Sequence, residues 1–259
     1  MNLFLLTQPD AFYIPKLLDQ FMEEKPASAN VVGAAVLPGE IAVENVPDYL
    51  RLMGVRGTVL NGLDFVRHKA LDVLDQAVRL DDVYSVRGAL RAHDIPEHTP
   101  ENVNDPAFLD FLREQNVDLV VSIACPQIVR EELLECAPEG VINIHGALLL
   151  KYWGKLPSFW VLANGEEKTG VTVHYMNEDL DDGPIIVQKE VPIRPSDTLH
   201  SLVLRSKVQY GASALADAVQ QIENGTVEMT DNPEEEATYF SFPTPDAIAR
   251  FRDRGRRIR

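Results

Sequence analysis

The sequence has few cysteines and no long apolar run. Cys125 and Cys136 are the two cysteines among 259 residues, so a disulfide framework is excluded and a reducing, cytoplasmic compartment is expected. No uninterrupted apolar stretch approaches the roughly 18 residues that a membrane helix requires, and the N-terminus lacks the basic segment of a signal peptide. We therefore expect no membrane partner.

Positive charge is also scarce, because 24 Lys and Arg face 40 Asp and Glu, for a formal net charge of −16. Residues 245–259 contain six Arg and two Asp, a local charge of +4, so subtraction leaves −20 on residues 1–244. A body this acidic repels polyanions, so we expect no DNA partner and disfavour tRNA. A small phosphorylated ligand stays compatible, because it needs only a few well-placed donors.

Several cofactor and catalytic motifs are missing. No histidine pair has HExxH spacing and no cysteine pair has CxxC spacing, so we expect no metal site. The turn after the first apolar run reads Leu6-Thr7-Gln8-Pro9 and contains no glycine, which disfavours a Rossmann dinucleotide cofactor. The absence of a G-x-S-x-G elbow argues against an α/β-hydrolase.

The first 145 residues alternate between strand and helix patterns. Apolar runs at 2–6, 31–36, 119–123 and 140–144 predict strands, and the segments between them show helical spacing. Two of these helical segments are 45–53 and 64–80, the second with Phe65, Leu71, Leu74 and Val78 as its apolar face. Such alternation is typical of βαβ units, so we predict an α/β fold with a mixed, mostly parallel sheet.

The pattern changes after residue 145. Two β-rich runs, 170–176 and 184–192, precede a long helix over about 198–224 that Gly225 closes. Residues 226–259 predict an acidic loop, a strand at 238–242 and a basic helix from about Pro245. We therefore expect a catalytic domain over 1–225 and a short C-terminal strand-and-helix extension over 226–259.

The strongest candidate for chemistry is Asn143-Ile144-His145, at the carboxyl end of an apolar strand. Spacing of two puts both polar side chains on one side of the strand, facing the crevice where open α/β sheets bind ligands. An amide can stabilise a developing oxyanion while an imidazole handles a proton. On spacing alone, however, a turn-forming asparagine and a structural histidine explain the pair better.

A second element, Leu180-Asp181-Asp182-Gly183-Pro184, is by itself an ordinary turn sequence. Together with Asn143-Ile144-His145 and Thr169-Gly170-Val171-Thr172, it resembles the formyltransferases that use N10-formyltetrahydrofolate. Their signature is N-x-H, S-L-L-P-x-Y-R-G, T-G-V-T and L-D-x-G-P/D in that order. The resemblance covers roughly residues 1–225 in layout and is sharp over about 117–193. It implies a Rossmann-like formyltransferase core.

The resemblance also implies roles for single residues. Asn143 would hold the formyl oxygen, His145 would accept a proton or supply charge, and Asp181 would orient His145. N10-formyltetrahydrofolate is the implied co-substrate, in a pocket between residues 123–129 and 176–180. Backbone groups near Val129, Asn177 and Glu178, together with Asp181, would bind it.

One motif departs from the family pattern. The usual S-L-L-P-x-Y-R-G here reads Ala147-Leu-Leu-Leu-Lys-Tyr-Trp-Gly154, without its proline and with Trp153 in place of a cation. Trp153 is either a stacking surface for a sugar or base, or a packing anchor. Lys151, Tyr152 and Lys155 complete our candidate substrate-binding residues.

The closest members of the family in style are the sugar N-formyltransferases. Glycinamide ribonucleotide formyltransferase is disfavoured because its glycine-rich phosphate loop is absent, and the tRNA enzyme because 34 residues after Gly225 are too few for its C-terminal barrel. We therefore predict a nucleotide-linked amino sugar as the acceptor. A formyltetrahydrofolate hydrolase, a methionyl-tRNA formyltransferase-like enzyme and a catalytically idle homologue are the alternatives. The strand at 238–242 could pair between subunits of a homodimer or add to its own sheet.

Overall fold

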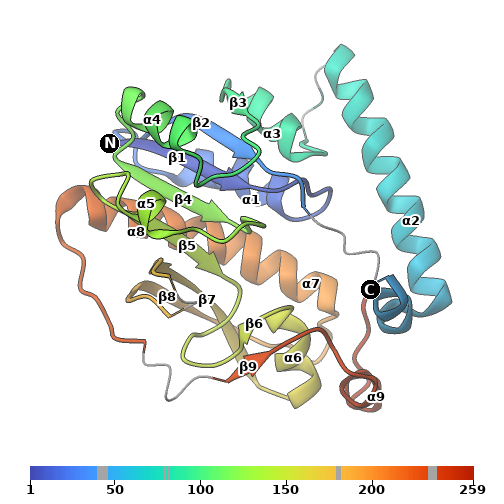
Figure 1. Ribbon diagram of the computed structural model, residues 1–259. Coiled ribbons are helices and arrows are strands. Elements are labelled where there is room, and N and C mark those ends of the chain that lie inside the picture. The colour runs from blue at the N-terminus through green and yellow to red at the C-terminus, as the bar shows by residue number, and fades with distance from the viewer. Residues whose placement is uncertain (40–45, 79, 81, 179–181, 233–237) are drawn as a thin grey trace.

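The computed structural model describes residues 1–259 except 40–45, 79, 81, 179–181 and 233–237 (Figure 1). Its main sheet has seven strands in the order β3-β2-β1-β4-β5-β7-β8. These strands are β1 (Asn2–Thr7), β2 (Asn30–Val36), β3 (Glu97–His98), β4 (Leu119–Ile123), β5 (Val141–His145), β7 (Lys168–Tyr175) and β8 (Ile185–Pro192). The β1–β5 pairings are parallel, whereas β7 and β8 are antiparallel. The predicted mixed, mostly parallel sheet is confirmed.

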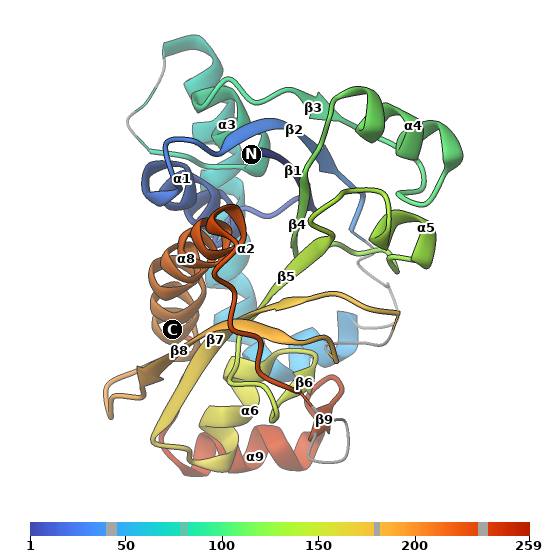
Figure 2. The ribbon, with the colours of Figure 1, turned by 90° about the vertical axis from the view of Figure 1, so that its left-hand side faces the viewer.

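Helices cover both faces of the sheet, as Figure 2 shows. On one face lie α1 (Ile14–Glu24), α3 (Val86–Ala92) and α8 (Gly211–Asn224), which share a large apolar cluster with the sheet. On the other face lie α4 (Pro106–Glu114) and α5 (Glu131–Leu134), with a smaller cluster. All five residues of β4 are buried as a result, which accounts for its largely apolar sequence.

The helix predicted over 198–224 is continuous in space but not uniform. It begins as α7 (Leu199–Val203), continues as a π-helical segment (Leu204–Tyr210) and ends as α8. Thr198 and Ser201 form a reciprocal capping box at its start. Gly225 ends it with φ 63°, the left-handed conformation that glycine adopts without steric cost.

The C-terminal segment packs beside the end of the sheet that carries β7 and β8. Strand β9 (Tyr239–Phe240) pairs in parallel with β6 (Trp153–Gly154). It is shorter than the predicted strand at 238–242. Helix α9 (Pro245–Asp253) packs against α6 (Pro157–Asn164) in a third apolar cluster. The predicted order of strand and then basic helix is confirmed.

Helix α2 (Val46–Val78) runs along one side of the molecule and consists of two helices joined at a kink (Figure 1). We expected separate helices at 45–53 and 64–80, but residues 55–63 are helical too, and the break is a kink at Gly54, where φ is 67°. Of its expected apolar face, Phe65, Leu74 and Val78 are exposed. Within the described residues, no helix combines the length and apolar character needed to cross a bilayer.

Candidate active site

The end of β5 carries the predicted polar pair beside two polar residues of β7. Register places Asn143 opposite His174 and His145 opposite Thr172. Because side chains alternate along strands, all four residues lie on the same face of the sheet. The parallel strands β1, β4 and β5 end at this edge, which is the ligand-binding edge of open α/β sheets.

His174 fixes the orientation of the Asn143 amide. The Nδ1 of His174 lies 2.8 Å from the carbonyl oxygen of Tyr175, which can only accept, so Nδ1 carries the proton of the neutral ring. The unprotonated Nε2 then accepts a hydrogen bond from Nδ2 of Asn143 at 3.2 Å. One N–H of the amide is used in this bond, and the amide has a second N–H to offer to a ligand.

The backbone of Tyr152 holds the His145 ring. Nε2 of the buried His145 lies 2.9 Å from the carbonyl oxygen of Tyr152. In the neutral ring this bond places the proton on Nε2. The site therefore combines an oriented amide donor with an oriented imidazole two residues along the same strand.

Thr172 ties down the loop that follows β5. Its hydroxyl donates to the Ala147 carbonyl at 2.7 Å and accepts from the Leu149 amide at 3.2 Å and from Nε2 of Gln188 at 3.0 Å. One donor and two acceptor positions are thereby filled. We conclude that Thr172 positions residues 147–149 rather than binding a ligand.

The candidate substrate-binding residues have different surroundings. Lys151 and Lys155 are exposed. Trp153 is buried against Leu149 and Ile185, in the position of a packing anchor. Tyr152 is buried as well, and desolvation, with a hydrogen bond to Glu166, raises the pKa of its hydroxyl to about 12.

The C-terminal segment supports this loop directly. The Tyr152 amide donates to Oγ1 of Thr238 at 2.9 Å, and the Trp153 amide donates to the Thr238 carbonyl at 2.9 Å. The Tyr152 ring also stacks on Phe240, with centroids 5.2 Å apart. The peptide that holds His145 is thus itself held by residues 238–240.

The two segments predicted to bind folate come together in the second apolar cluster. Val129 is buried in this cluster, and Cys125 and Met176 pack against its edge. Burial raises the pKa of the Cys125 thiol, as expected for a packing residue rather than a reactive one. Glu178 is exposed, and Nδ2 of Asn177 donates to Oδ2 of Asp182 at 3.2 Å.

The turn after residue 181 is closely packed. A Cβ on Gly183 would lie 1.8 Å from the carbonyl oxygen of Tyr175, so only glycine fits against this strand end. The predicted catalytic residue Asp181 lies outside the described residues. Among the residues that are described, no group of His, Cys, Asp and Glu side chains has the arrangement of a metal site.

Comparison with known families agrees with the motifs. The model of the formyl transferase family matches residues 72–219, more than half of the chain. The chain belongs to the formyl transferase family.

Solved structures of two kinds share this fold. Glycinamide ribonucleotide transformylase 1 from Symbiobacterium toebii matches with a TM-score of 0.60 and 19% identity, over 90% of this chain and 92% of that one. A sugar N-formyltransferase from a Shewanella species matches with a TM-score of 0.57 and 21% identity, over 93% of this chain and 76% of that one. An N-formyltransferase from Helicobacter canadensis, in complex with folinic acid and dTDP-3-aminofucose, matches with a TM-score of 0.57 and 20% identity, over 93% of this chain and 71% of that one. These identities establish a common fold and do not distinguish between acceptors.

At the turn between β1 and α1, a side chain occupies the backbone amides that could otherwise bind a phosphate. Oδ1 of Asp10 accepts hydrogen bonds from the amides of Phe12, Tyr13 and Ile14 at 2.7, 2.6 and 3.1 Å. A helix N-terminus with free amides attracts phosphate. Here a carboxylate already occupies those amides and adds negative charge.

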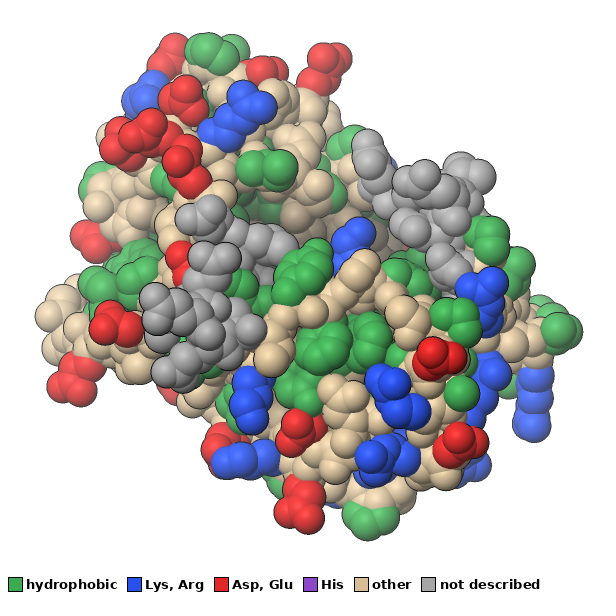
Figure 3. Space-filling view, turned by 60° about the horizontal axis from the view of Figure 1, so that its bottom comes forward, with side chains coloured by type: hydrophobic (Ala, Val, Ile, Leu, Met, Phe, Trp, Pro, Cys, Tyr) green, Lys and Arg blue, Asp and Glu red, His purple; other side chains and the backbone are tan. Residues whose placement is uncertain are grey.

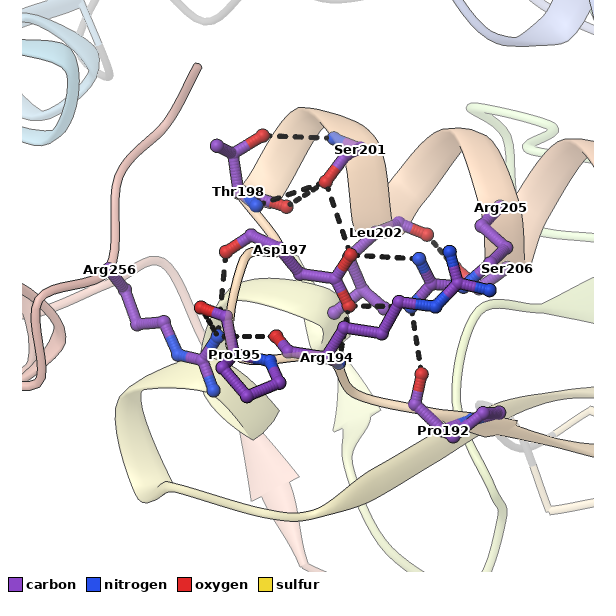
Figure 4. Close-up of polar contacts among 10 residues, drawn as sticks. All are labelled: Pro192, Arg194, Pro195, Asp197, Thr198, Ser201, Leu202, Arg205, Ser206 and Arg256. Carbon is purple, nitrogen blue, oxygen red and sulfur yellow. Dashed lines mark hydrogen bonds and ion pairs between the residues drawn. The ribbon is translucent and has the colours of Figure 1, made fainter.

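A buried ion pair near the start of α7 was not foreseen from the sequence (Figure 4). Asp197 accepts from Nη1 and Nη2 of Arg205 at 2.8 and 2.6 Å and from the Arg194 amide at 2.7 Å. Nη1 of Arg256 donates to the Arg194 carbonyl at 2.9 Å, so the C-terminal segment joins the same network.

His174, Thr172 and Asp10 were likewise not assigned a role from the sequence. A signal existed for the first two, because they alternate along β7 as Asn143 and His145 do along β5. The register that brings the two pairs together is a property of the folded sheet.

Proposed function

We propose that this chain transfers a formyl group from N10-formyltetrahydrofolate to the amine of a small substrate. The observation that carries the proposal is the Asn143 amide, held by His174 and lying two residues from an oriented His145 on the ligand-binding edge of the sheet. Membership of the formyl transferase family supports the reaction class.

In this reaction the lone pair of the substrate amine attacks the formyl carbon, a C–N bond forms, and the carbon's bond to the donor nitrogen then breaks. Negative charge develops on the formyl oxygen, where the second N–H of Asn143 stabilises it. The imidazole of His145 accepts the proton that the amine loses. By resemblance to the family, Asp181 orients His145, and the donor nitrogen receives a proton as it leaves.

The folate pocket is assigned to the segments around Val129 and residues 176–178. Their packing in one cluster supports this assignment, because Val129 is buried in it and Met176 packs against it. The backbone near Val129, Asn177 and Glu178 would bind the pterin ring. This chain supplies positioning and charge stabilisation, and the bound donor supplies the formyl group.

For the acceptor we propose a nucleotide-linked amino sugar rather than glycinamide ribonucleotide. The support is Asp10, because a phosphate at the α1 N-terminus would have to displace a carboxylate that holds three amides. The diphosphate would instead be bound near the exposed side chains of Lys151 and Lys155.

The test measures release of tetrahydrofolate by the full chain in three reactions: without an amine, with glycinamide ribonucleotide, and with a panel of nucleotide-linked amino sugars. We expect turnover only with a member of the panel. Loss of the amide in Asn143→Ala should lower kcat by about 10²–10³-fold. Asn224→Ala is the matched control, because it removes an exposed amide at the far end of α8.

Each contrary result has a definite meaning. Release without an amine would identify a hydrolase, and turnover of glycinamide ribonucleotide would refute the proposed acceptor. No turnover with any acceptor, or an Asn143→Ala variant as active as Asn224→Ala, would refute the proposed reaction.

A further inference from the structure

Helix α2 turns its polar side to the protein and its apolar side to solvent. Asp64 pairs with Arg259, and Asp72 accepts from the Ser85 hydroxyl at 2.5 Å, so the acidic residues point inward. By contrast, Val55 is 86% exposed and Val66 is 65% exposed. A surface helix ordinarily shows the opposite arrangement.

The exposed apolar residues form one continuous face, which we call the apolar face of α2. Its main members are Val55, Val59, Leu63, Val66, Val73 and Leu74. At 3.6 residues per turn, these six residues occupy an arc of roughly 100° along residues 55–78. Exposed apolar surface of this extent marks a binding site rather than ordinary surface.

The exposed charges beside this face are all basic. Arg56, Arg67 and Lys69 are exposed, whereas the acidic residues of the stretch 55–78 are half-buried against the body. Nζ of Lys69 lies 5.7 Å from the centroid of the Phe65 ring. Long basic side chains at the borders of an apolar face can keep their stems in an apolar phase and their charges at its surface.

The arginine-rich C-terminal segment extends this basic character. Nη2 of Arg252 donates to the Arg51 carbonyl at 2.9 Å, and a cavity of about 460 Å³ between α2 and the C-terminus is lined by Arg56, Arg256 and Arg257. Together, residues 46–78 and 245–259 hold 10 of the 24 Lys and Arg of an otherwise acidic chain. In Figure 3, most Lys and Arg side chains lie in the lower right part of the view and most Asp and Glu elsewhere.

From this placement we infer that the apolar face of α2 docks on an anionic lipid bilayer. The helix would lie parallel to the membrane plane, with its apolar face among the acyl chains and its cations on lipid phosphates. A second copy of the chain fits less well, because its α2 would bring further cations and no exposed carboxylate between residues 55 and 78. Docking of this kind needs no spanning segment, so it revises our expectation that the protein has no membrane partner.

The test is co-flotation of the full chain with vesicles of phosphatidylcholine alone and of phosphatidylcholine with about a third phosphatidylglycerol. We expect binding to the anionic vesicles and weakening by salt. Val66→Glu should weaken binding at least about tenfold. Replacing Arg67 and Lys69 by Gln should weaken it about fivefold for each charge. Gln115→Glu, which adds the same charge as Val66→Glu at an exposed site on the end of α4, should bind like the unchanged protein.

All four substituted residues are exposed, so a circular dichroism melt should be unchanged in every variant. Equal binding to both vesicle types, no binding to either, or equal binding by Val66→Glu and Gln115→Glu would overturn the inference. So would sedimentation of the lipid-free protein as a dimer that Val66→Glu converts to monomer, which would identify the apolar face as a self-association surface.

Discussion

Replacing Arg205 by Met should destabilise the protein strongly, because it leaves a carboxylate buried without its main partner. The side chain of Asp197 is 4% exposed and that of Arg205 is 11% exposed. Burial alone would raise the pKa of Asp197, but hydrogen bonds from Arg205, the Arg194 amide and Ser201 hold the pKa below its usual range. Asp197 is therefore ionised at neutral pH and depends on those donors.

Breaking a buried ion pair on one side costs about 3–5 kcal/mol. Because the Arg194 amide and Ser201 still donate to Asp197, we expect the lower end, about 3 kcal/mol. For a chain of this size that corresponds to a Tm lower by roughly 6–12 °C. The control is Arg87→Met, which breaks a pair with Glu97 in which Arg87 is 58% exposed, and it should cost less than about 1 kcal/mol.

Urea unfolding followed by circular dichroism measures both variants. The pKa of Asp197 also predicts an acid dependence. Because its folded pKa lies below the unfolded value, its stabilising contribution is present above about pH 3.9 and is lost as the pH falls further. In Arg205→Met this acid-dependent loss should shrink. An Arg205→Met variant no less stable than Arg87→Met would refute the conclusion that the pair is buried and interdependent.

Two other predictions concern the site turn and histidine burial. Gly183→Ala places a Cβ against the Tyr175 carbonyl, a backbone group, so the turn carrying Asp182 must shift, and both kcat and the Tm should fall. Burial lowers the pKa of His200, whose Nδ1 is 2.9 Å from the Tyr13 hydroxyl. Its contribution to stability is therefore present above about pH 6.5 and lost as the pH falls below it. His200→Gln should reduce the difference between urea midpoints at about pH 7.5 and about pH 5.5.

The central strands and the polar pair of β5 could be predicted because they depend on local pattern. Residues 119–123 are apolar on both faces, which requires a central strand, and the spacing of Asn143 and His145 requires a shared face. The orientation of the Asn143 amide could not be predicted, since it depends on His174, 31 residues away across an antiparallel register.

Helix α2 also shows that local sequence pattern does not determine tertiary contacts. Its periodicity predicted a helix and an apolar face, but periodicity does not tell which face meets the body. That choice follows from partners remote in the sequence, such as Arg259 for Asp64 and Ser85 for Asp72. Local pattern therefore determined the element, and tertiary contacts determined its orientation.

The C-terminal extension shows that contacts remote in sequence also position a candidate catalytic residue. The carbonyl of Tyr152 accepts a hydrogen bond from Nε2 of His145, and the N–H of the same peptide group, that of Trp153, donates to the Thr238 carbonyl, so a single peptide connects the imidazole to a residue 93 positions later. Parallel pairing of β6 with β9 fixes the neighbouring residue in the same way. Since the tautomer of His145 depends on the bond at Nε2, the extension helps to determine which ring nitrogen carries the proton. Residues 238–240 therefore support the candidate active site, although in sequence they follow the segment that carries every family motif.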